Sequence, residues 1–492
     1  MKKSKSTRLV IAVMLVGGVI PYLALGDDSH VYEDEDWPMF MHDYHNTGYS
    51  RSAAPDSPYL LWTFDTGQRL FGSPVVCNGT VYQAGRGSLF ALDSETGALI
   101  WSSELPVEGS TPFVTGDSLY VGTCNGIAAV DSRTGGLLWE VQLVDFSCNP
   151  WKDQTSYFLS SSPIVTDTGV IMCTHRNMLY DTANPHPEGI NEVVCLDVKD
   201  GTCLWRYPYI ERAGYSPALL DNIIILNSDQ LRFLDVRTGQ QLWSYETGFL
   251  SDTSPVITQS TLVTTSSEDG TIYAFDINVR DLLWTRCLND LVFSTPAVHN
   301  NRIIELTFDE SLYVLDEKKG SVLWKKDLWE EPSFSVIDIA QNRQAGFSSS
   351  PAVADNKIYV GLASGTFMCL KLDTGDISWK YKTGGSIVAS PAVANERVFV
   401  ASTDGKVYCF GIDPATYFQK AEEYREQKDT ERAREFYLRA EEYFQSKGDL
   451  NMVRKCQKRT GKGTNTWLVI PLGLCILGGL LILYKKESKG RK

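Results

Sequence analysis

The apolar residues in the central part of the chain occur in short runs that are separated by turns rich in Gly, Asn and Asp. Residues 349–379 contain four of these runs, "PAVA", "KIYVGL", "TFMCLKL" and "DISWKYK". Runs of this kind, rich in Val, Ile, Tyr and Phe and bounded by turn residues, are typical of β-strands. No helical period interrupts them. The stretch therefore predicts four antiparallel strands joined by tight turns.

The same arrangement recurs along the chain, because two short motifs alternate. Repeats of about 40 residues indicate a propeller or a solenoid, and four antiparallel strands per repeat are typical of a propeller blade. We therefore expect an all-β fold, an eight-bladed β-propeller, over residues 59–413. The first motif is Ser or Thr followed by Pro, with prolines Pro74, Pro112, Pro163, Pro217, Pro255, Pro296, Pro351 and Pro391. The second ends in Trp, at Trp62, Trp101, Trp139, Trp205, Trp243, Trp284, Trp324 and Trp379.

The two ends of the repeat region complement each other. The last repeat begins at Pro391 and supplies only three strands before the pattern becomes helical. The stretch "YLLWTFDTGQ" at residues 59–68 has the form of a fourth strand, but no repeat precedes it. A closed ring leaves no unpaired blade edge at its junction. We therefore expect residues 60–65 to pair with residues 406–411 and to complete the eighth blade.

The stretches "ALDSETGALIW", "LDVRTGQQLW" and "SSPAVADNKIYVG" resemble the quinoprotein-type β-propeller repeat, also called the PQQ-like or tryptophan-docking repeat. The resemblance covers roughly residues 59–413. It implies that each Trp docks between neighbouring blades and that a Thr-Gly turn joins the two outer strands. "FDINVRDLLW" departs from this pattern, so we expect a different outer turn in that blade. The turn is present at 96–97, 134–135, 238–239 and 374–375 and is looser at 200–201 and 319–320.

Helical patterns follow the propeller repeats. Asp413 and Pro414 suit the start of a helix, as N-cap and first-turn residues. Ala and aromatic residues then recur at helical spacing, which predicts a tetratricopeptide-like helical hairpin over residues 414–460. One such unit is too small to form a superhelix. We expect it to act as a stalk, or to pack on the propeller or on a partner, ahead of a linker at 461–465.

Both ends of the chain point to a membrane. Residues 1–26 have a basic start, an apolar stretch and small residues at a cleavage position, which predicts a signal peptide, with an uncleaved anchor as the alternative. Residues 466–484 contain no charge and span roughly 28 Å as a helix, which predicts a transmembrane segment. The basic tail, 485–492, is expected in the cytoplasm. The propeller and its lead-in segment, 27–58, are therefore expected outside the cell.

The composition of the chain bears on which ligands it can bind and on the state of its cysteines. The net charge of -14 argues against general affinity for nucleic acid, and 6 His residues make a His-rich metal centre improbable. Cys195 and Cys203 flank a short turn and are a possible disulfide in a translocated chain. The other reading of the cysteines is as buried free thiols within strands, as at Cys77, Cys173 and Cys369.

Three long connections identify a candidate binding face. They follow Trp139, Trp324 and the second strand of the third blade. Strands of a blade alternate in direction, so all three connections should emerge on the same face, and loops on rigid scaffolds often carry function. The alternative is tolerated surface decoration. The candidate contact residues are Trp151, Arg176, His186, Trp329, Phe334 and Arg343.

These features favour a non-catalytic, cell-surface module that binds other proteins or cell-surface glycans, without nucleic acid or cofactor. The alternative, which the family resemblance implies, is a quinoprotein dehydrogenase that oxidises an alcohol or sugar with pyrroloquinoline quinone and calcium. Such alcohol dehydrogenases use a disulfide between adjacent cysteines. This sequence has no adjacent cysteine pair, and no Glu, Asn and Asp set matches the metal site. We therefore assign no catalytic, cofactor-binding or metal-binding residue.

Overall fold

The computed structural model describes most of the repeat region and the helices that follow it. The chain divides into two compact units between Ile412 and Asp413. In the part of the chain that the structure describes, no helix is both long and apolar enough to cross a membrane. The expected signal peptide and membrane segment lie outside these residues. The described ranges are 35–107, 109–143, 161–174, 191–209, 216–228, 230–246, 253–267, 269–329 and 349–461.

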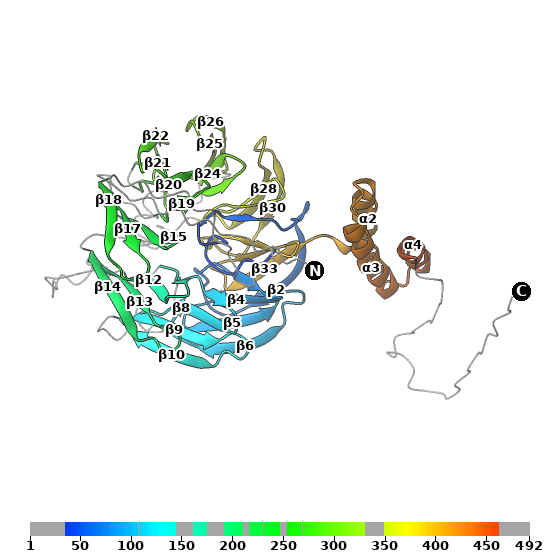
Figure 1. The fold of residues 1–492 in the computed structure, drawn as a ribbon. Coiled ribbons are helices and arrows are strands. Elements are labelled where there is room, and N and C mark those ends of the chain that lie inside the picture. Colours follow the sequence, from blue (N-terminus) through cyan, green and yellow to red (C-terminus); the bar gives the residue numbers. More distant parts are fainter. Residues whose placement is uncertain are drawn as a thin grey trace, which may run out of the picture. The chain divides into compact units, whose positions relative to one another are not determined.

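The described residues of the first unit form eight four-stranded antiparallel blades arranged as a ring (Figure 1). This confirms the predicted all-β, eight-bladed propeller. In blades one to seven, the four strands follow the chain from the inner to the outer side of the ring. Blade one contains β3 (Val75–Cys77), β4 (Thr80–Ala84), β5 (Ser88–Asp93) and β6 (Leu99–Glu104). Blade two contains β7 (Phe113–Thr115), β8 (Ser118–Gly122), β9 (Gly126–Asp131) and β10 (Leu137–Gln142).

The remaining blades repeat this arrangement. Blade three contains β11 (Ile164–Val165), β12 (Val170–Thr174), β13 (Asn191–Leu196) and β14 (Cys203–Tyr209). Blade four contains β15 (Ala218–Leu220), β16 (Ile223–Asn227), β17 (Gln230–Asp235) and β18 (Gln241–Glu246). Blade five contains β19 (Val256–Ile257), β20 (Thr261–Thr265), β21 (Thr271–Asp276) and β22 (Leu282–Cys287). Blade six contains β23 (Ala297–His299), β24 (Arg302–Leu306), β25 (Ser311–Asp316) and β26 (Val322–Asp327). Blade seven contains β27 (Ala352–Ala354), β28 (Lys357–Gly361), β29 (Thr366–Lys371) and β30 (Ile377–Lys382).

The eighth blade is completed by the N-terminal strand, as the sequence predicts. Strand β2 (Tyr59–Asp65) pairs antiparallel with β33 (Lys406–Gly411), outside β32 (Arg397–Ala401) and β31 (Ala392–Ala394). Trp62 lies opposite Cys409 in this pairing. Main-chain hydrogen bonds between the two ends of the repeat region therefore hold the ring closed.

Burial explains why the strand patterns differ within a blade. The middle strands are buried on both sides because neighbouring blades pack face to face, so β5 and β29 read as nearly continuous apolar runs. Each outer strand instead has a bulge immediately before its Trp. In β6, Leu99 pairs with Leu92 and Trp101 with Ala91, which leaves Ile100 as the extra residue. The bulge leaves Leu99 and Ile100 exposed and turns Trp101 toward the interior. It also makes the outer edge of the blade irregular, which limits pairing of this edge with strands of other chains.

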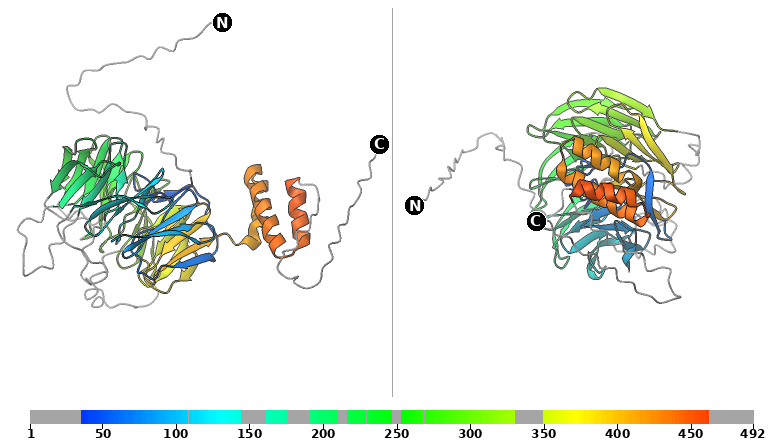
Figure 2. Two further views of the ribbon diagram at one scale, coloured as in Figure 1. Left: turned by 90° about the horizontal axis from the view of Figure 1, so that it is seen from below. Right: turned by 90° about the vertical axis from the view of Figure 1, so that its right-hand side faces the viewer.

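The second unit contains a 3-10 turn, η1 (Pro414–Thr416), and three helices: α2 (Tyr417–Glu426), α3 (Thr430–Ser446) and α4 (Leu450–Thr460). Figure 2 shows these helices in orange and red. The carboxylates of Asp413, Asp429 and Asp449 cap the starts of η1, α3 and α4 by accepting backbone N–H bonds, whereas α2 follows η1 directly and has no side-chain cap. The core lies between the helices and contains Ala421, Ala433, Phe436, Tyr437, Ala440, Val453 and Cys456.

Candidate binding face and inner ring

The Ser or Thr that precedes each repeat proline links neighbouring blades. In seven of the eight junctions, the backbone N–H of this residue donates to the hydroxyl of its counterpart in an adjacent blade, over 2.9–3.2 Å. The link from Ser390 to Ser73 joins the last blade to the first. The junction of blades four and five, between Ser216 and Ser254, is the exception. Among the described residues, the Ser254 hydroxyl has no hydrogen-bond partner.

The lead-in segment runs along the inner strands of the whole ring. In six blades, the N–H two positions after the repeat proline donates to a lead-in carbonyl over 2.8–3.0 Å. In blade three the Tyr44 hydroxyl donates to the Val165 carbonyl at 2.7 Å, and in blade eight Ser52 accepts from the Glu396 N–H at 2.8 Å. Strand β1 (Tyr49–Ser50) adds to β27 as a parallel strand. One segment therefore contacts all eight blades.

Two polar residues fix the path of this segment. The Asp43 carboxylate accepts the N–H groups of His45 and Thr47, both at 3.0 Å, and the Thr47 hydroxyl. Burial opposes ionisation of Asp43, but His42 and these hydrogen bonds lower its pKa below the usual value. Asn46 is fully buried and adopts a left-handed conformation, with φ of 57°. Its side-chain N–H groups donate to the carbonyls of Pro217 and Pro255, at 3.1 and 3.0 Å, in blades four and five.

The lead-in segment and the strand ends from which the long connections start lie toward opposite faces of the ring. Asp36 and Ser52 accept from Asn78 and Glu396, which are in the turns between the first and second strands of their blades. We call this side the turn face. In blade three, β12 is the second strand and β14 is the fourth. The antiparallel pairing of both with β13 places the C-terminal ends of β12 and β14 at the same edge of the blade. The three long connections therefore start on the other side, which we call the connection face.

The structure describes one of the six candidate contact residues. Trp329 follows the buried Leu328 at the start of the long connection from blade six, and its side chain is 43% exposed. An exposed Trp at a loop base is a suitable interface anchor. Trp151, Arg176, His186, Phe334 and Arg343 lie outside the described residues, so their assignment to a binding face stays a prediction.

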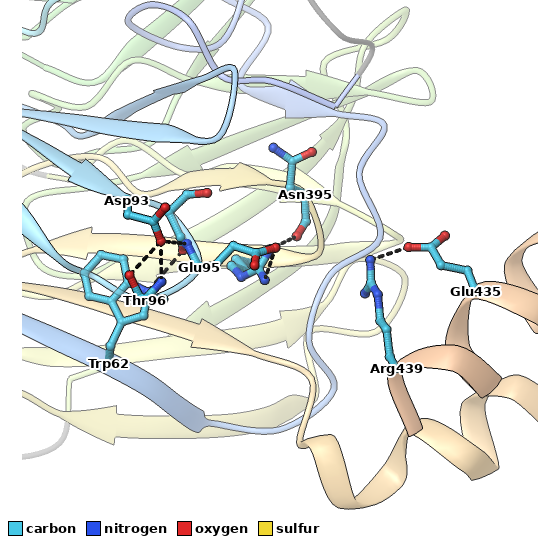
Figure 3. A network of polar contacts seen from close by, with 9 residues as sticks. Trp62, Asp93, Glu95, Thr96, Asn395, Glu435 and Arg439 are labelled. Atoms are coloured by element: carbon cyan, nitrogen blue, oxygen red, sulfur yellow. Dashed lines mark hydrogen bonds and ion pairs between the residues drawn. The ribbon is translucent and has the colours of Figure 1, made fainter. Parts of the chain in front are cut away.

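The outer-strand Trp residues pack on the outer turn of the next blade. Figure 3 shows this contact for Trp62, beside the turn in which Asp93 accepts from Thr96. The indole N–H of Trp62 donates to the Ser94 carbonyl at 3.1 Å. A Cβ added to Gly97 would lie 2.5 Å from the Trp62 ring, so only glycine fits beneath it. Five other indoles make the equivalent hydrogen bond, in which the indole N–H donates to the carbonyl of the second residue of the outer turn. They belong to Trp101, Trp139, Trp205, Trp284 and Trp324.

At blade seven, the closing segment replaces the missing turn. Blade eight has no covalent turn between β33 and β2, because these strands come from opposite ends of the repeat region. Trp379 therefore donates to the Pro55 carbonyl, at 3.3 Å. The Tyr359 hydroxyl donates to the same oxygen at 3.1 Å. Lys357 holds this segment through Asp56, at 2.8 Å, so the closure includes residues before β2 as well as the strand itself.

Blade five keeps the outer turn that its sequence suggested it had lost. The Arg280 N–H donates to the Asp276 carbonyl at 2.8 Å, as the glycine N–H does in the other turns. Our expectation of a different turn was therefore wrong. Arg280 occupies the glycine position in a left-handed conformation, with φ of 61°. Its guanidinium lies over the Trp243 ring, and in the described part of the chain the Trp243 indole makes no hydrogen bond.

A buried acid lies between blades five and six. Glu305 is fully buried in β24 and accepts from the hydroxyls of Ser294, at 2.7 Å, and Thr265, at 2.9 Å. Burial raises its pKa to about 8, although both hydrogen bonds oppose this shift. In blade one, Gln83 takes the same position in its strand, with donors to the carbonyls of Gly72 and Ala84. Because its pKa is about 8, the carboxyl of Glu305 is protonated near pH 7. Like the amide of Gln83, it serves as a neutral hydrogen-bonding group inside the blade.

The described residues do not match a quinone and calcium site. Calcium requires several ionised oxygen ligands that converge. Among the residues that the structure describes, no three His, Cys, Asp or Glu side chains converge to hold a metal. The buried Glu305 is neutral and bonded to two hydroxyls, which makes it a poor calcium ligand. The donors among the described residues thus do not fit a quinone and calcium site.

The cysteines that the structure describes are free thiols. Cys195 is buried and Cys203 is exposed, and both are free thiols, so the expected disulfide is not formed. Strand register explains this, because Cys203 pairs with Leu196 whereas Cys195 pairs with Trp205 across a bulge. Burial raises the pKa of Cys173 and Cys369 to about 12, which keeps these thiols protonated.

Several of these residues were not identified from the sequence. The Ser/Thr-Pro motif was recognised, but its hydroxyls were not recognised as links between blades. Asn46 lies in "HNTGYS", where an Asn before a Gly-containing turn hinted at a left-handed residue. Glu305 interrupts the apolar run "RIIELTF", and an acid inside a buried strand was an available signal.

Comparison with known proteins places these features in a wider group. A family model described as the outer membrane protein assembly factor BamB matches residues 51–180, 124–264, 231–343 and 326–416. The protein of that name from Shewanella oneidensis is 30% identical over 95 residues, which is 19% of this chain. That alignment spans only 24% of the relative's own length.

Solved structures with the same fold include BamB and two dehydrogenases. BamB from Moraxella catarrhalis aligns with a TM-score of 0.54 and 18% identity, covering 72% of this chain and 99% of that one. The quinohemoprotein alcohol dehydrogenase from Comamonas testosteroni aligns with a TM-score of 0.61 and 14% identity, covering 79% and 84%. A europium-containing methanol dehydrogenase aligns at 0.59 and 14%, covering 75% and 90%. At these identities the likeness concerns the fold alone.

Proposed function

Since the chain belongs to the PQQ-type β-propeller family represented by the outer membrane protein assembly factor BamB, we propose that it is a non-catalytic scaffold that binds other proteins. The observation that carries this proposal is the contrast between the two faces. The lead-in segment lines the inner strands toward the turn face, whereas the long connections start on the connection face, at the base of which Trp329 is exposed. We propose the connection face as the binding surface.

We further propose that the scaffold is anchored at the cell surface. Residues 1–26 would direct translocation, residues 466–484 would span the membrane once, and residues 485–492 would remain in the cytoplasm. This arrangement would display the propeller outside the cell. An anchor of this kind differs from a lipoprotein signal, so we do not extend the assembly role in the relatives' name to this chain. Carbonate extraction and protease protection in intact cells would test it, and release into the soluble fraction would overturn it.

A photo-crosslinking residue tests the connection face in cells. We place it at position 329 and, as a control, at position 138, where Leu138 is exposed on the outer rim. A discrete crosslinked protein is expected only from position 329. The purified partner should then bind the full chain saturably, and Trp329→Ala should weaken this binding at least tenfold while Leu138→Ala leaves it unchanged, since buried Trp anchors often contribute more than about 2 kcal/mol. Equal effects of both variants would exclude this face.

The quinoprotein alternative has its own test. The structural likeness to a quinohemoprotein alcohol dehydrogenase motivates it, although the donors among the described residues do not fit. Purified full chain is mixed with pyrroloquinoline quinone and calcium and then analysed by absorbance and native mass spectrometry. We expect no stoichiometric complex. A complex at one quinone per chain would overturn the scaffold proposal.

A further inference from the structure

Helix α4 has two chemically distinct sides. Val453 and Cys456 are buried against the other helices of its unit. The opposite side carries Arg454, Lys455, Lys458 and Arg459, and the helix contains no acidic residue. At 100° per residue, these four cations lie within the half of the helix surface that faces away from the buried residues. A basic face of this kind contrasts with the net charge of -14 of the whole chain.

The cations of α4 differ from those of the neighbouring helices in their pairing. On α2 and α3, cations pair with acids three or four residues away, as in Arg425 with Glu422 and Arg439 with Glu435. On α4, Arg459 pairs with Glu422, at 2.9 Å. Within the described residues, Arg454, Lys455 and Lys458 form no ion pair, and all three side chains are exposed. This leaves a concentrated set of cations available for an external anionic partner.

The position of α4 in the chain suggests what that partner is. The helix ends at Thr460, and Gly461 terminates it in a left-handed conformation, with φ of 72°. The segment proposed to span the membrane begins at Thr466, six residues after Thr460 by their numbers. Six extended residues reach at most about 20 Å. The chain therefore keeps α4 close to the headgroups of the outer leaflet, and anionic headgroups there attract basic residues that lie within about a Debye length.

We propose that the basic face of α4 rests on the phosphate groups of anionic membrane lipids. This inference deepens the proposed function, because it rests on the membrane attachment of residues 466–484. The apolar side of α4 remains buried in its own unit, so the contact is electrostatic and does not insert into the bilayer. Its physical consequence is that the membrane orients the helical unit. The contact weakens with salt, because exposed charges are screened over a Debye length of about 10 Å at 0.1 M.

The experiment uses the full chain reconstituted in lipid nanodiscs. Hydrogen exchange of residues 450–460 is compared between discs of phosphatidylcholine alone and discs that also contain phosphatidylglycerol. The test variant is Arg454→Gln, Lys455→Gln and Lys458→Gln. The matched control, Lys428→Gln, Arg434→Gln and Lys447→Gln, removes three exposed cations from the same unit outside α4. Circular dichroism of each variant checks that the helices remain folded.

Anionic lipid should slow exchange in α4 of the natural chain and of the control, but not of the test variant. Each cation near an anionic surface contributes roughly fivefold in affinity, so removal of three should abolish the effect, as should high salt. Equal exchange in both kinds of disc would overturn the proposal. Loss of the effect on adding inorganic phosphate at unchanged ionic strength, or slowing by added RNA without anionic lipid, would also overturn it.

Failure of this inference is distinguishable from failure of the proposed function. If residues 466–484 do not anchor the chain, the protein elutes apart from the discs, whatever its α4 sequence. If the scaffold proposal fails, the crosslink at position 329 is absent while the exchange of α4 still depends on lipid charge. If only the α4 contact fails, the chain remains in the discs and binds its partner normally.

Discussion

The guanidinium of Arg280 lies over the indole of Trp243 in a cation–π contact, with 5.6 Å between the guanidinium carbon and the ring centre. Arg280 occupies the turn position that glycine holds in six other blades. In those blades the Trp of the preceding blade lies directly against the glycine and donates to the backbone. At this junction, Trp243 instead approaches Phe233, with ring centres 4.7 Å apart. The ring thus has one junction at which a cation replaces the usual contact.

Arg280→Gly should convert this junction to the common arrangement. The change removes left-handed strain that costs an L-residue about 1–2 kcal/mol and permits an indole hydrogen bond worth about 1 kcal/mol. It also loses a cation–π contact of about 0.5–1 kcal/mol and adds flexibility to the unfolded chain. We expect the free energy of unfolding to rise by about 1 kcal/mol in urea titration. A crystal structure of the variant should show the Trp243 indole donating to the Ile277 carbonyl. Reduced stability would mean that the cation–π contact between Arg280 and Trp243 stabilises the fold more than the new hydrogen bond does.

Gly97→Ala tests the contact at the closing blade. A methyl group there would lie 2.5 Å from the Trp62 ring and would also be held at φ of 71°. Gly116→Ala is the matched control, because Gly116 has φ of 55° and no atom near its absent side chain. The control should lose about 1 kcal/mol of stability from backbone strain. Gly97→Ala should lose a further 1–3 kcal/mol or so from overpacking, and similar losses for both would show that Trp62 has room to move.

The sequence predicted the ring itself because its determinants are local and repeated. Each repeat Pro marks the first strand of a blade and each repeat Trp marks the fourth. Their alternation therefore predicted the number of blades, and also that the strand containing Trp62 pairs with the strand containing Cys409. The contacts between blades were not predictable in the same way. Asn46 bonds to Pro217 and Pro255, more than 170 residues away, and no local pattern specifies such partners. The outer turn of blade five was not predictable from residue type, because Arg280 stands where the other turns have glycine and yet adopts the same left-handed conformation.

Two substitutions of Asn46 should separate its hydrogen bonds from its backbone conformation. Asn46→Gly removes both side-chain bonds to blades four and five but suits φ of 57°. Asn46→Ala removes the same bonds and adds left-handed strain of about 1–2 kcal/mol. We expect losses of about 2 kcal/mol for Asn46→Gly, at about 1 kcal/mol per bond, and about 3 kcal/mol for Asn46→Ala, measured by chemical denaturation. Unchanged stability of Asn46→Gly would show that the lead-in segment does not stabilise the ring through Asn46.

Glu305 should make the propeller less stable as pH rises. Its pKa is about 8 in the folded chain, against an ordinary value of 4.5, so between these values only the folded state holds the proton. Stability then falls with rising pH across this window, by up to about 1.4 kcal/mol per pH unit. Glu305→Gln should flatten this dependence and be the more stable protein at pH 9. Glu140→Gln, on an exposed strand position, serves as the control; an unchanged slope in Glu305→Gln would assign the pH dependence to other groups.

The missing hydrogen bond between blades four and five, at the Ser254 hydroxyl, can be tested by substitution. Ser254 and Ser350 occupy equivalent positions before a repeat proline, and both are buried. The Ser350 hydroxyl accepts from the Thr295 N–H at 2.9 Å, whereas that of Ser254 has no partner among the described residues. Ser350→Ala should cost about 1–3 kcal/mol because it leaves a buried N–H unpaired. Ser254→Ala leaves no donor unpaired and removes an unsatisfied hydroxyl, so stability should stay equal or rise by up to about 1 kcal/mol. Equal losses in thermal and urea unfolding would mean that the fourth and fifth blades share the same link as the others.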